Sequence, residues 1–237
     1  MTQVTVDVKK LMEAGAHYGH QARRWNPKMK PYIYGVSDGV HVFDLIKTKE
    51  LLTAALLRLS EVAKEGKTIL LVGTKKQAKD KVREVAQSTG CFFVNERWLG
   101  GTLTNFDQIK KSTLKLAQMK KKMEEGEYKA YTKKERLLIE REITRLERFF
   151  GGVSGMEKLP DIILIIDSKR QIGAVSEANA KGVEIIAIVD SNSDPTKIDY
   201  PIPMNDDATK ALDYVLDLVR EAILIGKKKP KGSKSTI

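Results

Sequence analysis

Three short runs of apolar residues constrain the fold of this chain more than any other feature. The runs KTILLVG, DIILIID and EIIAIVD occupy residues 67–73, 161–167 and 184–190. Continuous apolar runs of this length, bounded by turn residues, are typical of strands that a parallel sheet buries on both faces. Segments with helical character follow them at 75–89, 168–182 and 206–226. Strands that alternate with helices predict an α/β fold, a three-layer, doubly wound parallel sheet with helices on both faces.

Shorter elements are expected around these strands. The dipeptide Asp38-Gly39 lies between alternating apolar residues and predicts a tight hairpin turn. Asp44 stands where it can cap a helix that runs to Gly66. The run CFFV predicts a further strand, and the Pro-rich stretch after the last apolar run predicts a loop.

The region 104–150 departs from this alternation. Its apolar residues recur at spacings of three and four, both before and after Gly126. The seam positions are Phe106, Ile109, Thr113, Leu116, Lys120 and Met123, then Ile139, Ile143, Leu146 and Phe150. Seams this narrow predict that two helices pair as an antiparallel coiled-coil hairpin inserted between strands, because neither could also cover a sheet. The alternative is two ordinary surface helices of the main domain.

These elements divide the chain into four parts. Residues 1–103 hold an N-terminal basic arm and the first part of the α/β domain, 104–152 the inserted helical hairpin, 153–226 the second part of the domain, and 227–237 a basic tail. The tail is rich in Lys and has no apolar periodicity, so it is expected to be disordered unless it is bound.

Positive charge is concentrated in three segments of the chain. The formal net charge is +11, of which residues 1–34 carry +4, residues 104–150 carry +5 and residues 227–237 carry +5, while all other residues together carry −3. A near-neutral body with basic appendages is expected of a protein that binds a polyanion, because cations that neutralise phosphates release counterions. A generic solubilising surface is the alternative, although such surfaces usually mix both signs throughout.

Several classes of protein find no support in the sequence. No window approaches the ~20 consecutive apolar residues of a membrane span. The N-terminus has no apolar core of a signal peptide, so no membrane partner is expected. The lone Cys91 excludes an intramolecular disulfide and suits a reducing cytoplasm.

Catalytic motifs are missing as well. No G-x-G-x-x-G fingerprint or G-x-S-x-G elbow occurs, and the GKT at 66–68 precedes a strand instead of following one. Asp167 and Asp190 end strands, where they could bind a metal or a ribose, but such residues are also common helix caps. His17 and His20 have no evident further ligands for zinc, and the calcium-like run DSNSDPTKIDYP lacks the required Gly and Glu. We therefore expect no enzyme, cofactor, metal or small-molecule substrate.

The stretch HYGHQARRWNPKMKPYI at 17–33 combines cations, aromatic rings and prolines. Its cations can contact phosphates and its flat side chains can stack on unpaired bases, while the prolines lower the entropy lost on docking. The candidate RNA-binding residues in this stretch are His17, Tyr18, His20, Arg23, Arg24, Trp25, Lys28 and Lys30.

Two later stretches offer similar chemistry. VGTKKQA places Lys75 and Lys76 at a helix N-terminus, where a phosphate of RNA or of a nucleotide could bind; a plain strand-to-helix turn is the alternative. NERWLGGTLTNF places Arg97 and Trp98 before two glycines that allow close backbone approach. For Trp98, as for Trp25, the alternative is a boundary residue packed beneath the sheet.

Five blocks of the sequence resemble one known family. The blocks are EAGAHYGHQARRWNPKMKPYIYG, VGTKKQA, NERWLGGTLTNF, MEKLPDIILIID and AIVDSNSDP…IDYPIPMNDDA, in this order. They are similar to the bacterial form of the universal small-subunit ribosomal protein number two. The resemblance implies a flavodoxin-like α/β domain with an inserted helical hairpin, and binding to small-subunit ribosomal RNA at the head–body junction. It also implies late assembly, neighbouring ribosomal proteins as partners, including help in docking the large mRNA-binding ribosomal protein number one, and a cytoplasmic place on the ribosome.

By the same resemblance, the N-terminal block and the hairpin face the RNA. This adds Lys110, Lys111 and Lys115 to the candidate residues. Two rival interpretations remain open at this point. One is a nucleotide-dependent enzyme that acts through Asp167 or Asp190, and the other is a nucleic-acid-binding or adaptor protein that works outside the ribosome.

Overall fold

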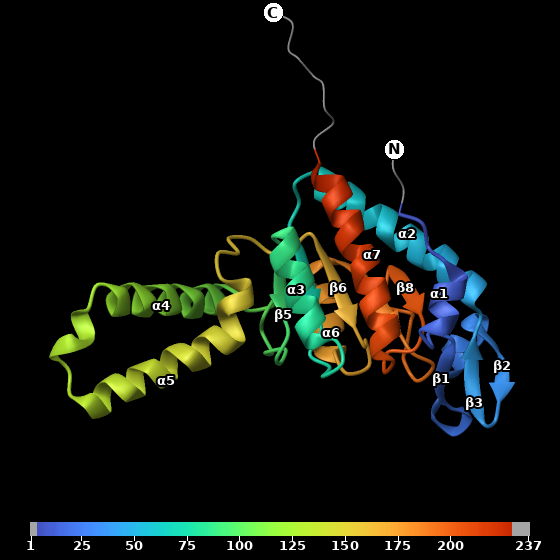
Figure 1. Cartoon of the computed structure of the whole chain (residues 1–237), viewed down its shortest axis with the longest axis horizontal. Helices are drawn as coiled ribbons and strands as arrows, with labels where there is room; N and C mark the ends of the chain where they lie inside the picture. The colour runs from blue at the N-terminus through green and yellow to red at the C-terminus, as the bar shows by residue number, and fades with distance from the viewer. Residues whose placement is uncertain (1–3, 229–237) are drawn as a thin grey trace, which may run out of the picture.

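The computed structural model describes residues 4–228, and its centre is a five-stranded parallel sheet (Figure 1). The strands are β4 (Ile69–Val72), β5 (Phe92–Val94), β6 (Ile162–Ile166), β7 (Glu184–Val189) and β8 (Tyr200–Pro203). They lie in the order β5-β4-β6-β7-β8, and every neighbouring pair is parallel. Numbered along the chain, this is the 2-1-3-4-5 order of flavodoxin-like folds, which confirms the predicted fold class.

Helices cover both faces of this sheet. α1 (Val8–Glu13), α2 (Leu45–Lys64), α3 (Lys79–Thr89) and α7 (Thr209–Lys227) contribute to one core, and α6 (Ile172–Lys181) contributes to the other. Asp44 caps α2 as expected, since its carboxylate accepts hydrogen bonds from the backbone amides of Ile46 and Lys47. Among residues 4–228, none of the helices is long and apolar enough to cross a membrane.

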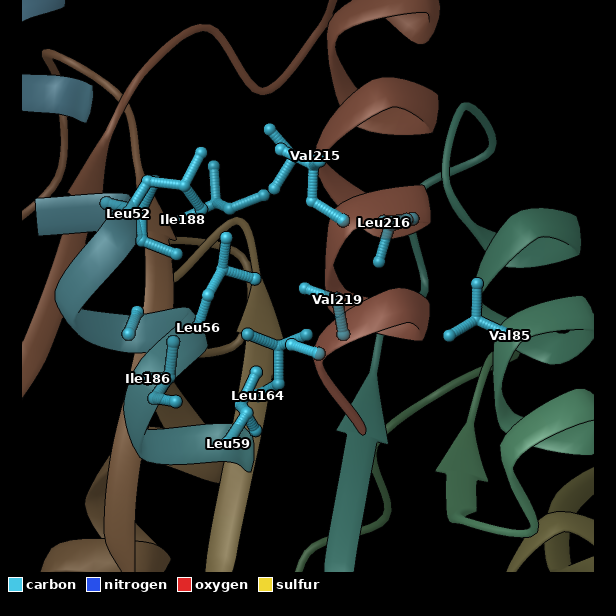
Figure 2. Close-up of a cluster of buried hydrophobic side chains, with 14 of the residues drawn as sticks. Leu52, Leu56, Leu59, Val85, Leu164, Ile186, Ile188, Val215, Leu216 and Val219 are labelled. Atoms are coloured by element: carbon cyan, nitrogen blue, oxygen red, sulfur yellow. The ribbon is translucent and has the colours of Figure 1, made fainter. Parts of the chain in front are cut away.

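The two cores explain why the strands have continuous apolar runs. Alternate residues of one strand enter opposite cores, as Ile163 and Leu164 of β6 do, so each position must be apolar. Figure 2 shows the first core, where Leu56 and Leu59 of α2 gather with Leu164 and with Val219 of α7. Burying each such side chain stabilises the fold by about 1.5–3 kcal/mol before the entropy of ordering is subtracted.

The basic N-terminal stretch is folded, whereas the sequence indicated neither helix nor strand there. β1 (Tyr18–Gln21), β2 (Ile33–Ser37) and β3 (Val40–Phe43) form a separate antiparallel sheet in the order β1-β3-β2. Two short 3-10 helices, η1 (Ala22–Arg24) and η2 (Pro27–Tyr32), connect β1 to β2. β1, η1 and η2 are too short for a periodic pattern, which is why they escaped prediction, whereas the hairpin of β2 and β3 was predicted. The turn at Asp38-Gly39 joins β2 to β3 as predicted. We call β1–β3 with η1 and η2 the N-terminal sheet.

The remaining corrections concern element boundaries. The Pro-rich segment contains β8, which pairs with β7 at the edge of the large sheet, where Pro201 and Pro203 are tolerated because one side of an edge strand needs no ladder hydrogen bonds. The helices expected to begin at residues 75, 168 and 206 begin at Lys79, Ile172 and Thr209, because turns or loops precede them.

Two long helices project together from the body (Figure 1). They are α4 (Phe106–Glu124) and α5 (Lys133–Phe150), joined through η3 (Glu127–Ala130), and η4 (Gly151–Val153) leads back to the sheet. Of the predicted seam, Ile109, Thr113, Leu116 and Leu146 are buried, whereas Met123 near the tip is exposed. The apolar seam is therefore filled toward the base, and coiled-coil packing along the whole length stays a prediction. We call residues 106–150 the hairpin.

Candidate nucleic-acid interface

The N-terminal sheet presents cations to solvent. Arg24 and Lys30 are exposed and form no ion pair with any residue between 4 and 228. Arg23 is also exposed, and its guanidinium Nε donates to the neutral amide oxygen of Gln21 at 3.0 Å. These three side chains therefore keep an uncompensated positive charge, which a phosphate could neutralise.

The same element is anchored firmly to the body. The Asn26 backbone amide donates to the Ser191 carbonyl at 2.7 Å, and the His20 amide donates to the Ser191 hydroxyl at 2.8 Å. Met29 is fully buried in the core on the α6 face. The loop after β7, which begins like a calcium site in the sequence, thus holds the N-terminal sheet in place.

His20 takes part in this anchoring through its ring. Its Nδ1 lies 2.9 Å from a carboxylate oxygen of the buried Asp190. The hydrogen bond to Asp190 raises the pKa of His20, against burial, which lowers it. His20 thus has a structural ion partner, and among the described residues no cluster of three or more His, Cys, Asp or Glu side chains could hold a metal ion.

The aromatic candidates differ in how much of their faces is free. The Tyr18 side chain is exposed, and its ring lies 4.0 Å from the ring of His17, whose Nδ1 is buried without a hydrogen-bond partner. Trp25 is half-buried, and one face of its indole lies 4.9 Å from the buried ring of His41. Tyr18 is therefore better placed than Trp25 to stack on an unpaired base.

Two of the candidate lysines already have carboxylate partners. Lys28 forms an exposed ion pair with Asp194 at 2.7 Å and lowers the pKa of that carboxyl to about 2. Lys75 is buried and lies 2.5 Å from Asp206 and 2.6 Å from Asp207. Although burial lowers the pKa of Lys75, hydrogen bonds to these carboxylates raise it more. These contacts give Lys75 a structural role, because its buried ammonium already has two carboxylate partners. Lys76, the next residue, is exposed and forms no ion pair among residues 4–228.

Trp98 is a structural residue rather than a free stacking platform. Its indole N–H donates to Glu177 at 3.0 Å, and its ring lies against Gly173 of α6. Arg97 beside it is exposed and forms no ion pair in the described part of the chain. The structure therefore supports the boundary-residue alternative for Trp98 and leaves Arg97 available to an RNA.

The hairpin carries a second group of cations. Lys111 is exposed, and Lys110 donates to the Glu157 carbonyl at 3.1 Å without meeting a carboxylate. Lys115 pairs across the hairpin with Glu142 at 3.2 Å. Two exposed arginines of α5, Arg136 and Arg141, form no ion pair within residues 4–228, and sequence reasoning missed them. The excess of cations across 104–150 was the signal that could have found them.

The two basic elements lie at opposite ends of the molecule. Figure 1 shows the N-terminal sheet at one end of the long axis and the hairpin at the other, with the parallel sheet between them. A polyanion that touched both would therefore span the body. The third basic segment of the sequence, the tail, lies mostly outside the described residues.

Comparisons with known proteins bear on what such a surface serves. The family model described as "Ribosomal protein S2" matches residues 11–226. The chain is 48% identical over 221 residues to "Small ribosomal subunit protein uS2" of Geotalea uraniireducens, which covers 93% of this chain and 86% of the relative. It is 49% identical to the protein of that name from Nitratiruptor sp. (94% of this chain, 83% of the relative) and 43% identical to that of Coprothermobacter proteolyticus (96% and 85%).

Proposed function

Since the chain belongs to the ribosomal protein S2 family, and so is a structural constituent of the small ribosomal subunit, we propose that it joins two segments of small-subunit ribosomal RNA through basic elements at its two ends. The observation that carries this proposal is the separation of the unpaired cations. Arg23, Arg24 and Lys30 lie on the N-terminal sheet, and Lys111 lies on the hairpin at the far end of the body.

Membership of this family also decides between the interpretations left open by the sequence. Its members are structural proteins of the ribosome, so the chain is not an enzyme, and a place on the small ribosomal subunit is favoured over a free-standing adaptor. The strand-ending aspartates have structural partners instead: Asp190 accepts from His20, and Asp167 accepts from the backbone amide of Arg170 at 2.9 Å.

The proposed mechanism relies on electrostatics and on rigidity. Each cation that neutralises a phosphate releases condensed counterions, which supplies the affinity. The parallel sheet fixes the distance between the two basic ends, so two RNA segments bound to them would be held in one relative position. The head–body junction, where two parts of the subunit meet, is the site that such a spacer suits, and the family resemblance supports it.

Salt dependence of binding tests this proposal. We expect the variant Arg23→Ala/Arg24→Ala/Lys30→Ala to bind a small-subunit ribosomal RNA fragment more weakly, with the slope of log K against log salt reduced by about 2–3, because each lost phosphate contact removes a released counterion. The matched control, Lys49→Ala/Arg83→Ala/Lys181→Ala, removes the same charge from exposed residues of α2, α3 and α6 that form no ion pair among those described. Equal slopes for the two variants would reject the assignment of the N-terminal sheet.

We further propose that the body docks a neighbouring ribosomal protein, the large mRNA-binding ribosomal protein number one by the family resemblance. Outside the three basic segments the chain carries a net charge of −3, which suits a partner with a basic surface. Carboxylates of α3 and α7, including Asp80, Glu84 and Asp213, line one open surface pocket there. Replacing these three by Asn or Gln should weaken capture of that protein by small subunits without changing RNA binding, as measured by co-sedimentation. Unchanged capture would contradict this part of the proposal.

A further inference from the structure

An open pocket of about 530 Å³ lies at the carboxyl edge of the parallel sheet. It is formed where β4 leads toward α3 and where β6 leads toward α6, so its walls include Thr74 and Lys76 from one connection and Arg170 from the other. The strand order reverses between β4 and β6, since β5 lies on one side of β4 and β6 on the other. In open α/β sheets, ligands bind in the crevice at this reversal, beyond the carboxyl ends of the strands.

Hydrogen-bond donors without acceptors surround this pocket. In the connection between β4 and α3, the backbone amides of Lys75, Lys76 and Gln77 donate to no acceptor among residues 4–228. The side chain of Thr74, a residue that is only 9% exposed, accepts a hydrogen bond from the Gln171 amide, and its own hydroxyl proton has no acceptor in the described part of the chain. Successive free amides beside a buried hydroxyl donor form a concave site for an anion.

The charges around the pocket leave an excess of cations. Lys76 and Arg170 line it and form no ion pair with any residue from 4 to 228. The carboxylate of Glu96 is engaged by Lys79 at 3.2 Å and by Arg148 at 2.7 Å. The other lining carboxylate, Asp207, is engaged by Lys75 at 2.6 Å. Neither carboxylate is therefore left to neutralise the two free cations.

Carboxylates behind Lys75 would repel an anion unless their charge is balanced. Asp167 lies 3.6 Å from the Lys75 ammonium and Asp206 lies 2.5 Å from it. Burial, together with the charges of Asp190 and Asp167, raises the pKa of Asp206 to about 7. The Lys75 ammonium lies between these carboxylates and offsets part of their negative charge.

We propose that this pocket is a binding site for a phosphate group, carried either by an RNA backbone or by a free nucleotide. A phosphate is the anion that suits the site because several of its oxygens can accept at once, from the amides of the β4–α3 connection, the Thr74 hydroxyl, Lys76 and Arg170. The cations assigned to the two basic ends, Arg23, Arg24, Lys30 and Lys111, do not line this pocket, so it would bind a small phosphate compound whether or not those ends bind RNA.

Binding to the full chain can be measured with three probes. These are inorganic phosphate, adenosine 5′-monophosphate, and a short uridine oligonucleotide without a terminal phosphate, each followed by broadening of its ³¹P NMR signal at millimolar concentration. We expect the variant Lys76→Ala/Arg170→Ala to weaken binding by about tenfold or more, because it removes two charge-assisted contacts. The matched control Arg83→Ala/Lys181→Ala removes one exposed arginine and one exposed lysine elsewhere and should bind like the wild type.

Each outcome decides a different point. If the pocket variant alone no longer broadens the signals of all three probes, the pocket is a phosphate site open to both sources. If the pocket variant loses broadening of the oligonucleotide signal alone, the pocket is a site for an RNA backbone phosphate. No binding of any probe to the wild type, or equal binding by the two double variants, overturns the proposal. The variant Arg23→Ala/Arg24→Ala/Lys30→Ala separates this result from the function proposed above, because it should lose ribosomal RNA affinity and keep its affinity for adenosine 5′-monophosphate.

Discussion

Removing one carboxylate of α6 should loosen the loop at the base of the hairpin. Glu177 Oε1 accepts from the Trp98 indole at 3.0 Å and from the Gly101 amide at 2.9 Å. Its Oε2 accepts from the Leu103 amide at 2.9 Å and from the amide and hydroxyl of Thr104, both at 3.0 Å. Glu177→Ala leaves three backbone amides without an acceptor. Each costs about 1 kcal/mol where water can partly replace the carboxylate, so we expect a loss of about 3 kcal/mol in the free energy of unfolding.

Guanidinium chloride unfolding, followed by tryptophan fluorescence, measures this loss. For a chain of this size it corresponds to a fall in Tm of about 6–12 °C. Glu177→Gln keeps one acceptor oxygen and should lose about half as much. The control Glu221→Ala removes an exposed glutamate of α7 that forms no ion pair within residues 4–228, and it should change stability by less than about 0.5 kcal/mol. If Glu177→Ala and Glu221→Ala have equal effects, the carboxylate does not hold this loop.

The pH dependence of this effect has a definite sign. Burial acts to raise the pKa of Glu177, but the hydrogen bonds from Thr104, Trp98, Leu103 and Gly101 lower it more, so its net pKa lies below the usual value of 4.5. A carboxyl whose pKa is lowered by folding stabilises the protein above its unfolded pKa and loses this contribution as the pH falls through its folded pKa. The difference between the wild type and Glu177→Ala should therefore be constant near neutral pH and shrink in acid.

Three further predictions concern packing, titration and capping. Gly226→Ala should cost about 1–3 kcal/mol, since its Cβ would come within 2.2 Å of a backbone oxygen of α2, whereas Gly35→Ala meets no atom within 4 Å; thermal unfolding compares the two. The free energy of unfolding of the wild type should fall as the pH rises from about 5 to 8, because folding raises the pKa of both His20 and Asp206. Asp206→Asn should reduce that fall, as measured by urea unfolding at each pH. An unchanged slope of the free energy of unfolding against pH would contradict the assignment. Thr132→Ala removes the capping box of α5 and should speed amide exchange in its first turn without affecting the parallel sheet.

The sequence predicted the elements whose cause is local and missed those whose cause is distant. Continuous apolar runs located β4, β6 and β7, because a strand buried on both faces needs an apolar residue at every position. Asp44 could be recognised as a cap since its partners lie two and three residues away. β8 was missed because its prolines suggest a loop, and only its pairing with β7 makes it a strand.

The candidate site shows the same division. Cations could be recognised as cations, but whether each is free depends on partners far along the chain. Lys28 pairs with Asp194 and Lys75 with Asp206, across 166 and 131 residues. Glu177 looks like any helix glutamate, although its partners lie 73 to 79 residues away. No spacing rule reports such pairs, so sequence alone lists more candidate contacts than the fold leaves free.

The anchoring of the N-terminal sheet changes how it is expected to bind RNA. A flexible arm would lose conformational entropy when it docks, at about 1–2 kcal/mol per ordered residue. In this protein the N-terminal sheet already loses that entropy when the protein folds, because Ser191 accepts from Asn26 and His20 and because Met29 is buried. The cations of this element are thus presented in a fixed arrangement, which favours affinity through preorganisation. It follows that substitutions at Ser191 or Met29, which are both fully buried, should weaken RNA binding by releasing the element, although they leave every surface cation in place.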